Sequence, residues 1–336
     1  MTAGPNSAAP EAPPIEQLAD RRPTGITNPG VEELPERVTE LRIPSGDGDC
    51  AAWHYGPGTS GMCIVMTPGA GALKELGLPR FAERFADAGH DVLLFDFRHF
   101  GQSGGEPRQV LRIGRQREDL RAAVQYARAV LGFEYDRIVL WGMSFGAGVA
   151  MDVAARMPGL AGIVAQCPVT SGPYEAIEVP PVLSMRLGLH AFRDLVRAAV
   201  GRDPHYIPLA GGPGAVATRS GTQALRAQAA LNPDGYPWPQ DCSARFMMAV
   251  PLWSSLRTVG RIHCPMFVVL GEDDELISRR AARKAARKAP HAELLEIPGD
   301  HYEPFRDSSF EKVVAAQLLF LERNAAPVEL AKAGHA

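Results

Sequence analysis

A single serine lies between two glycines in the stretch "WGMSFG", which follows the apolar run "RIVL". A serine hydroxyl is a weak nucleophile unless a neighbouring base takes its proton, so Ser144 needs partners from elsewhere in the chain. The pattern Gly-x-Ser-x-Gly is weak by itself in a sequence with 34 glycines. It is informative only where a strand turns sharply into a helix. The alternative interpretation is that Ser144 is an ordinary helix cap.

Two later segments offer the base and the acid that an activated serine requires. "GEDD" contains Asp273 and Asp274, and "GDH" ends on His301. Each segment follows an apolar run that is typical of a buried strand. Because the carboxyl ends of parallel strands meet at one edge of a sheet, we expect these side chains to gather above Ser144. The order serine, aspartate, histidine occurs in one hydrolase fold and differs from the order in other serine-triad folds.

Strands and helices that would position these residues alternate along the chain. Two early strands, at 37–43 and 50–55, could form a hairpin. Buried strands are predicted at 62–67, 91–97, 137–142, 160–167, 265–271 and 292–297, and helices at 78–89, 113–131, 144–157, 278–289 and 310–324. Apolar strands that alternate with helices predict an α/β fold, in which a mostly parallel sheet is covered by helices on both faces.

Composition divides the chain into segments. Residues 1–35 are rich in proline, alanine and glycine and predict a flexible or extended N-terminal arm. Residues 36–169 and 261–325 are expected to form the core, and residues 326–336 a C-terminal tail. The block 170–260 is too long for a simple connection, so it predicts an inserted cap or lid.

Apolar side chains in the predicted cap indicate what kind of substrate the protein would bind. We expect most of them to pack the cap onto the core, and the rest to line an apolar pocket for a fairly hydrophobic acyl or alcohol group. They are Met185, Leu187, Leu189, Phe192, Leu195, Val196, Tyr236, Trp238, Phe246, Met247, Met248 and Trp253.

Four segments together resemble the α/β-hydrolase superfamily over about residues 37 to 323: "WGMSFG", "GEDD", "GDH" and the loop "FDFRHFGQSGG". The resemblance implies an α/β-hydrolase fold with Ser144 as nucleophile and His301 as base. Asp274 is the implied acid because it is the third residue after the glycine of its loop, and Asp273 is the alternative. Within the superfamily the chain is similar to a capped branch of esterases, dienelactone-hydrolase-like enzymes, Xaa-Pro peptidase-like proteins and acyl-transferring hydrolases of polyketide pathways.

The same resemblance implies an oxyanion hole made by two backbone N–H groups. One belongs to Phe145, the residue after the nucleophile. The other comes from the turn "TPGAGA", where Pro68 stands in place of the histidine that the family usually has. Proline has no N–H to donate, so the expected donor is Ala70, just after Gly69.

These residues predict a serine hydrolase that cleaves a carboxylic ester or thioester through an acyl-enzyme on Ser144. An acyltransferase that uses the same triad is the alternative, because a cap that excludes water would let another acceptor react. A peptidase and a noncatalytic ligand-binding protein are less favoured. The expected partner is a small-molecule ester, thioester or acyl substrate.

Other bulk features argue against further partners. A net charge of −3 predicts no binding to nucleic acid, and no apolar run is long enough to span a membrane. The five cysteines are scattered without metal-ligand spacing, so we expect no metal and no cofactor. Free cysteines and the lack of a signal-like start favour the cytoplasm. The oligomeric state stays open, with a homodimer through the N-terminal segment as one hypothesis.

Overall fold

The computed structural model of the protein describes residues 34–231 and 236–324. The predicted tail at 326–336, and nearly all of the predicted arm at 1–35, lie outside the described residues, so both stay predictions. Among the described helices, none combines the length and the apolar character that crossing a membrane requires.

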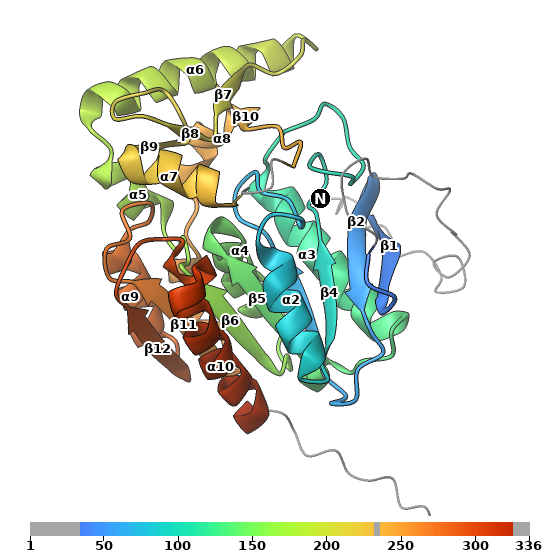
Figure 1. Cartoon of the computed structure of the whole chain (residues 1–336). Helices are drawn as coiled ribbons and strands as arrows, with labels where there is room; N and C mark the ends of the chain where they lie inside the picture. The colour runs from blue at the N-terminus through green and yellow to red at the C-terminus, as the bar shows by residue number, and fades with distance from the viewer. Residues whose placement is uncertain (1–33, 232–235, 325–336) are drawn as a thin grey trace, which may run out of the picture.

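An eight-stranded sheet forms the centre of the protein (Figure 1). Its order is β1-β2-β4-β3-β5-β6-β11-β12. The strands are β1 (Val38–Ser45), β2 (Gly48–Tyr55), β3 (Cys63–Thr67), β4 (Asp91–Phe95), β5 (Ile138–Met143), β6 (Gly162–Gln166), β11 (Met266–Gly271) and β12 (Ala292–Ile297). The predicted hairpin is confirmed, since β1 and β2 pair antiparallel, and β2 also pairs antiparallel with β4. The remaining neighbours in this sheet are parallel.

Helices cover both faces of this sheet because its central strands are apolar along their whole length. Side chains alternate between the faces of a strand. Val65 accordingly belongs to a buried apolar cluster that includes residues of α3 (Ile113–Ala129), α4 (Ser144–Ala154) and α9 (Arg279–Lys288). Its neighbour Ile64 belongs to a second cluster, which includes residues of α2 (Leu78–Asp87) and α10 (Asp307–Asn324). The predicted mostly parallel sheet flanked by helices is therefore confirmed.

An insertion between β6 and β11 forms the cap, which lies above the sheet in Figure 1. Its elements are α5 (Gly172–Glu178), α6 (Pro181–Ala199), β7 (Tyr206–Pro208), β8 (Ala210–Gly211), β9 (Arg219–Ser220), α7 (Thr222–Leu231), β10 (Asp241–Ser243) and α8 (Phe246–Ala249). Short 3₁₀ helices lead back to the core: η2 (Val250–Leu252), η3 (Ser255–Arg257) and η4 (Val259–Arg261). Two others, η1 (Tyr135–Arg137) and η5 (Glu303–Phe305), lie in the core.

Packing of the cap differs from the expectation drawn from its apolar residues. Trp238, Phe246 and Trp253 are buried, as expected. In α6 the expectation is wrong for five of the six apolar residues named above, because only Leu187 is buried. Met185, Leu189, Phe192, Leu195 and Val196 are exposed.

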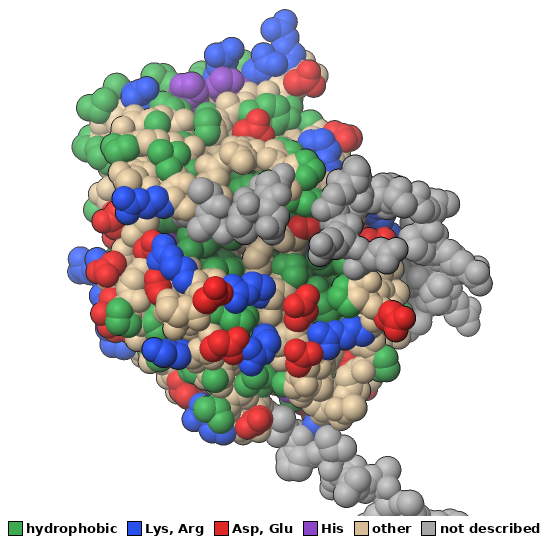
Figure 2. Space-filling view, viewed as in Figure 1, with side chains coloured by type: hydrophobic (Ala, Val, Ile, Leu, Met, Phe, Trp, Pro, Cys, Tyr) green, Lys and Arg blue, Asp and Glu red, His purple; other side chains and the backbone are tan. Residues whose placement is uncertain are grey.

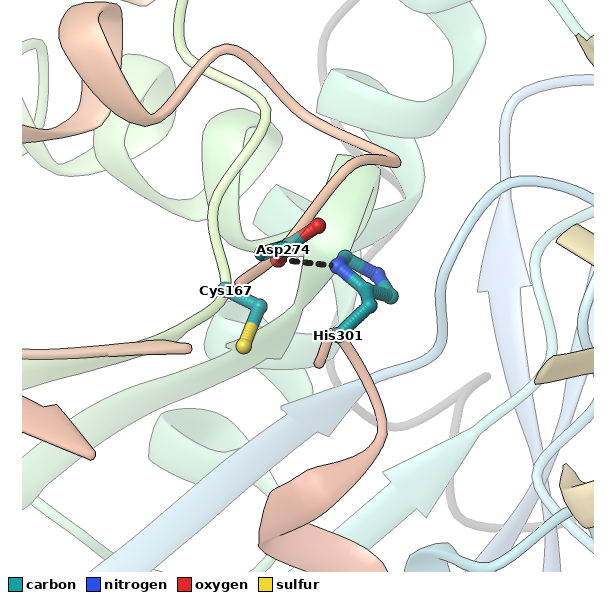
Figure 3. Close-up of side chains that lie close together, drawn as sticks. All are labelled: Cys167, Asp274 and His301. Carbon is teal, nitrogen blue, oxygen red and sulfur yellow. Dashed lines mark hydrogen bonds and ion pairs between the residues drawn. The ribbon is translucent and has the colours of Figure 1, made fainter. Parts of the chain in front are cut away.

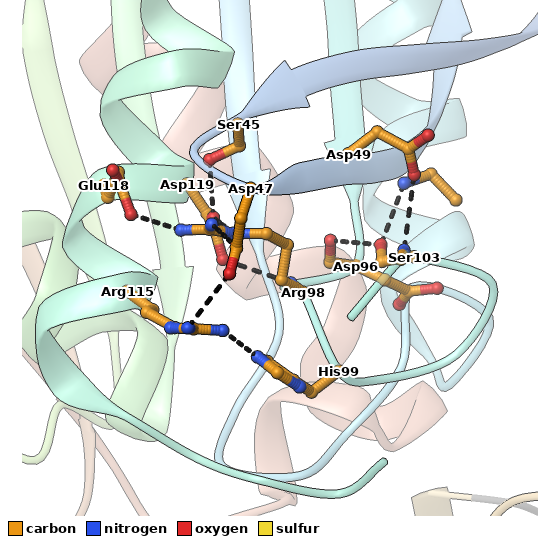
Figure 4. Close-up of polar contacts among 12 residues, drawn as sticks. Ser45, Asp47, Asp49, Asp96, Arg98, His99, Ser103, Arg115, Glu118 and Asp119 are labelled. Carbon is orange, nitrogen blue, oxygen red and sulfur yellow. Dashed lines mark hydrogen bonds and ion pairs between the residues drawn. The ribbon is translucent and has the colours of Figure 1, made fainter. Parts of the chain in front are cut away.

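A buried arginine fixes the loop that follows β4. The side chain of Arg98 is 1% exposed, and its Nε donates to Asp119 of α3 at 2.5 Å. Its other nitrogens bind Asp47, in the β1–β2 turn, and Glu118. Figure 4 shows Arg98 between these groups, with Ser45 donating to the same Asp119 carboxylate at 2.6 Å. The guanidinium therefore ties the hairpin, the loop and α3 together.

Replacement of this arginine tests how much the fold depends on it. Arg98→Met should lower the free energy of unfolding by about 3–5 kcal/mol, because the buried Asp119 carboxylate loses its countercharge. Urea unfolding followed by circular dichroism measures the loss. Arg84→Met is the control, since Arg84 pairs with Glu311 at the surface, where such pairs contribute about 0–1 kcal/mol. Equal losses in the two variants would contradict this account.

Candidate active site

Ser144 lies at the junction of β5 and α4 in a left-handed backbone conformation. Its φ is +54°, which is uncommon for a residue with a side chain and costs about 1–3 kcal/mol. The strand is buried throughout, and the helix begins at Ser144 itself. This is the sharp strand-to-helix turn in which the Gly-x-Ser-x-Gly pattern is informative.

The two glycines of the pattern are required by the close approach of other backbone segments. A Cβ on Gly142 would lie 2.6 Å from the Cα of Ala147, and one on Gly146 would lie 2.2 Å from the carbonyl oxygen of Pro68. Larger residues would push the turn open. The turn is therefore built from small residues because β3, β5 and α4 crowd around it.

His301 and Asp274 form a buried pair on the two loops that follow β12 and β11. His301 Nδ1 lies 2.6 Å from Asp274 Oδ2, and both side chains are at most 2% exposed. The second carboxylate oxygen of Asp274 accepts the backbone N–H of Leu276 at 2.9 Å. Because Asp274 engages Nδ1, the Nε2 atom of His301 is left for a substrate or a nucleophile.

Asp273 does not take part in this pair. The residue is exposed, and its backbone N–H donates to the carbonyl oxygen of Gly299. Its own carbonyl oxygen accepts a hydrogen bond at 2.9 Å from Gln223 of the cap helix α7. The structure thus places Asp274, and not the neighbouring Asp273, against the histidine.

A third buried group lies beside the pair. Figure 3 shows Cys167, which follows β6, next to Asp274 on the side away from His301. One ligand atom from each of the three side chains lies within 4.8 Å of the other two, a spacing that could hold a metal ion. Burial and the Asp274 charge raise the pKa of the Cys167 thiol, whereas a metal ligand must be a thiolate. The donor set therefore fits a neutral thiol against a carboxylate better than a metal centre.

The two residues expected to provide an oxyanion hole, Phe145 and Ala70, lie near Ser144. Phe145 N–H belongs to the first turn of α4, where helical N–H groups have no intrahelical acceptor. Ala70 lies in the turn after β3, and among the described residues its N–H makes no backbone hydrogen bond. Both residues line the same pocket as Ser144.

Charged side chains anchor the loop that carries Ala70. Asp96, after β4, accepts the backbone N–H of Lys74 at 2.7 Å and its Nζ at 3.1 Å. Lys74 and Asp96 are fully buried. The sequence pattern did not point to this pair, because a lysine in a loop is ordinarily exposed.

A pocket of about 840 Å³, its open mouth included, lies between the core and the cap. Ser144 and His301 line it together. The core also contributes Gly69, Ala70, Ala72, Phe145, Val169, Leu276 and Tyr302. The cap contributes Leu209, Ala210, Thr218, Arg219, Ala224, Gln228, Leu231, Trp238, Phe246, Met247 and Val250. The lining is mostly apolar, which is typical of sites for small organic ligands.

Aromatic contacts join the cap to the serine loop. The Phe145 ring lies 5.2 Å from that of Phe246 and 4.9 Å from that of Trp253. Trp238 Nε1 donates to the carbonyl oxygen of Gly71 at 2.8 Å. The cap is thus packed directly on the two segments that provide the backbone N–H groups.

Arg219 is the cation among the described residues that line the pocket. Its guanidinium donates at 3.0 Å to Glu175, whose other carboxylate oxygen accepts the N–H of Ser278. Burial raises the pKa of Glu175, and the Arg219 charge opposes this shift. Glu175 therefore positions Arg219 and offsets its charge, while other guanidinium N–H groups stay available to a ligand. Sequence analysis missed Arg219, because no motif marks it.

Comparison with known proteins gives concordant matches. The family described as serine aminopeptidase, S33, matches residues 64–307, a span that includes Ser144, Asp274 and His301. Quorum-quenching protein AidA from Acinetobacter baumannii (strain MDR-ZJ06) is 32% identical over 295 residues, which are 87% of this chain and 97% of the relative. Polyketide transferase grgF from Penicillium sp. is 26% identical over 277 residues, which are 82% of this chain and 92% of the relative. The crystal structure of alpha/beta hydrolase GrgF from Penicillium sp. sh18 superposes with a TM-score of 0.76 at 25% identity, covering 88% of this chain and all of that one.

The two neighbouring aspartates provide a matched test of this geometry. Asp274→Asn should lower kcat for a p-nitrophenyl ester by about 10³–10⁴, because an amide cannot hold His301 in the required tautomer or balance its charge. Asp273→Asn should leave kcat close to the wild-type value, since the Asp273 side chain is exposed and lies outside the pair. Near-ultraviolet circular dichroism checks that both variants fold. Loss of activity in the Asp273 variant alone would contradict the assignment.

Proposed function

The chain belongs to the serine aminopeptidase S33 family of α/β-hydrolases, and on that premise we propose that it transfers acyl groups from esters or thioesters through Ser144. The observation that carries the proposal is the pocket itself. A serine on a strained turn and a histidine held by a buried aspartate line one apolar hollow.

The reaction begins when Ser144 Oγ attacks the carbonyl carbon of the substrate and His301 Nε2 takes its proton. Asp274 holds Nδ1 and balances the imidazolium charge. The carbonyl oxygen becomes an oxyanion, which accepts hydrogen bonds from the N–H groups of Phe145 and Ala70. The tetrahedral intermediate then collapses, the leaving group takes the proton from His301, and an acyl ester remains on Ser144. Water then attacks this ester while His301 takes a proton from it. The proton passes to Ser144 Oγ as the acid is released.

Substrate preference follows from the lining of the pocket. Its apolar side chains favour a fairly hydrophobic acyl or alcohol portion. Arg219 adds a hydrogen-bond donor, and Glu175 offsets its charge. This donor suits a neutral oxygen on the substrate, such as a ketone, better than a carboxylate on the substrate. The name of one relative, a polyketide transferase, accords with acyl transfer.

A specific feature favours acyl transfer to an acceptor other than water as the second candidate function. A smaller hollow of about 240 Å³ adjoins the pocket and shares Gly69, Ala72, Leu231 and Tyr302 with it. Its lining is largely apolar, so it fits an organic leaving group or acceptor. Product analysis with and without an alcohol or thiol acceptor distinguishes transfer from hydrolysis.

Peptidase activity is less favoured for a reason of charge. A carboxylate is needed to bind the free amino terminus of a peptide, and none lines the pocket among the residues that the structure describes. Glu175 is close by, but its carboxylate is engaged by Arg219 and Ser278.

A series of p-nitrophenyl esters of increasing acyl length tests the proposal. The value of kcat/KM should rise by up to about fourfold per added methylene, because each buried CH₂ contributes about 0.8 kcal/mol. Met247→Ala should weaken this dependence, since Met247 lines the pocket, whereas Met248→Ala should not, since Met248 is exposed.

A second substrate pair tests the role of Arg219. Wild-type protein should prefer a 3-oxoacyl thioester to the matching acyl thioester, and Arg219→Met should remove that preference without lowering the rate on the unsubstituted substrate. In the series of p-nitrophenyl esters, rates that do not change with acyl length in the wild type or in either methionine variant would argue against an apolar acyl pocket.

A further inference from the structure

The cap helix α6 carries an apolar stripe on its outer side. Five large hydrophobic residues recur at alternating intervals of three and four, and one more follows the helix end. This stripe consists of Val182, Met185, Leu189, Phe192, Val196 and Val200, which are 47–68% exposed. Such spacing places side chains in one row along a helix and is typical of helices that pair with another helix.

The opposite face of α6 already packs on the rest of the cap. Its buried residues are Leu183, Leu187, Ala191 and Asp194. Leu183 and Leu187 contact Ile207 and Ala244 of the cap. At 3.6 residues per turn, the stripe points away from this buried face. Figure 2 shows hydrophobic side chains gathered at the top of the protein, where α6 lies in Figure 1. Among the described residues, nothing covers the stripe.

We propose that the stripe binds a second copy of this protein, with the two α6 helices antiparallel about a two-fold axis at Leu189. A symmetric interface requires one surface patch that is complementary to itself. The spacing meets this requirement. Val182 and Val196 lie seven residues on either side of Leu189, so each would face the other in the second copy. Met185 and Phe192, four and three residues from Leu189, would lie close to each other inside these pairs.

The exposed area reaches the lower limit for a specific dimer. The six side chains expose on the order of 600 Å² per copy, so an interface that covered them completely would bury up to about 1,200 Å² in total, which is the lower end of the range for specific interfaces. A contiguous apolar patch of this size is at the upper end of the range for the largest patch on a monomer, and such patches are often functional. Gly188 lies beside the centre, and a Cβ there would meet nothing within 4 Å. Neighbouring helices could therefore approach closely at this point.

Charges at the edge of the stripe oppose this pairing only weakly. Antiparallel helices bring Arg186 of one copy toward Arg193 of the other. The Arg186 guanidinium, however, donates to the carbonyl oxygen of Gly214 at 3.1 Å, which holds it back on its own cap. Both arginines are exposed, so water screens their repulsion. Antiparallel helices also place their opposite dipole ends together.

The oligomeric state of the full chain tests the proposal. Multi-angle light scattering should give about twice the chain mass of 36.1 kDa for the wild type. Leu189→Asp should give the monomer mass, because it places a charge on the axis. Leu319→Asp is the matched control, since Leu319 is an exposed leucine on α10, far along the chain from the stripe, and it should stay dimeric. Unchanged ester hydrolysis and circular dichroism show that each variant is folded.

Cross-linking locates the interface independently. Leu189→Cys should form a disulfide-linked dimer on mild oxidation, because the residue faces its own copy. Arg197→Cys, on another side of the same helix, should not. A wild type that is monomeric at every concentration would overturn the proposal, whether or not it binds lipid vesicles or another protein. A dimer that survives Leu189→Asp would also overturn the proposal. This outcome includes a dimer that is lost only when residues 1–33 are deleted.

Discussion

The left-handed turn at Ser144 is the constraint on which the rest of the site depends. It exists because Gly142 and Gly146 let Ala147 and Pro68 approach to distances that no side chain would tolerate. The same turn starts α4, places Phe145 in the lining of the pocket and brings the Phe145 ring against Phe246 and Trp253. The proposed nucleophile, the proposed oxyanion donor and the contact with the cap thus depend on one backbone conformation.

The charged side chains around this turn, Asp274 and Arg219, each lie against groups that offset their charge. Asp274 is buried, yet it accepts from His301 and Leu276 and lies against a thiol that stays protonated. Arg219 enters the pocket only together with Glu175. A pocket that is apolar and locally neutral suits an uncharged acyl ester or thioester, because a charged substrate would lose its hydration without gaining a countercharge.

Sequence reasoning predicted the fold, and the gathering of Ser144, Asp274 and His301 at one edge of the sheet, better than the surface of the cap. Apolar strands and amphipathic helices are local patterns, and Ser144, Asp274 and His301 stand at strand ends where topology brings loops together. Asp273 and Asp274 could not be separated by physics from sequence alone, since only the folded loop shows which carboxylate is buried. The residues of α6 were expected to pack on the core because periodicity shows that residues share a face, not what covers it. The places of Arg219 beside Glu175 and of Cys167 beside Asp274 could not be predicted, since these neighbours are distant in the sequence.

Covalent labelling of the serine tests the central claim most directly. Intact-protein mass spectrometry after a small fluorophosphonate should show one adduct that maps to Ser144. The labelling rate should fall sharply in His301→Ala, and no adduct should form in Ser144→Ala. An adduct on another residue, labelling that is indifferent to His301, or no adduct on folded wild-type protein would contradict an activated serine.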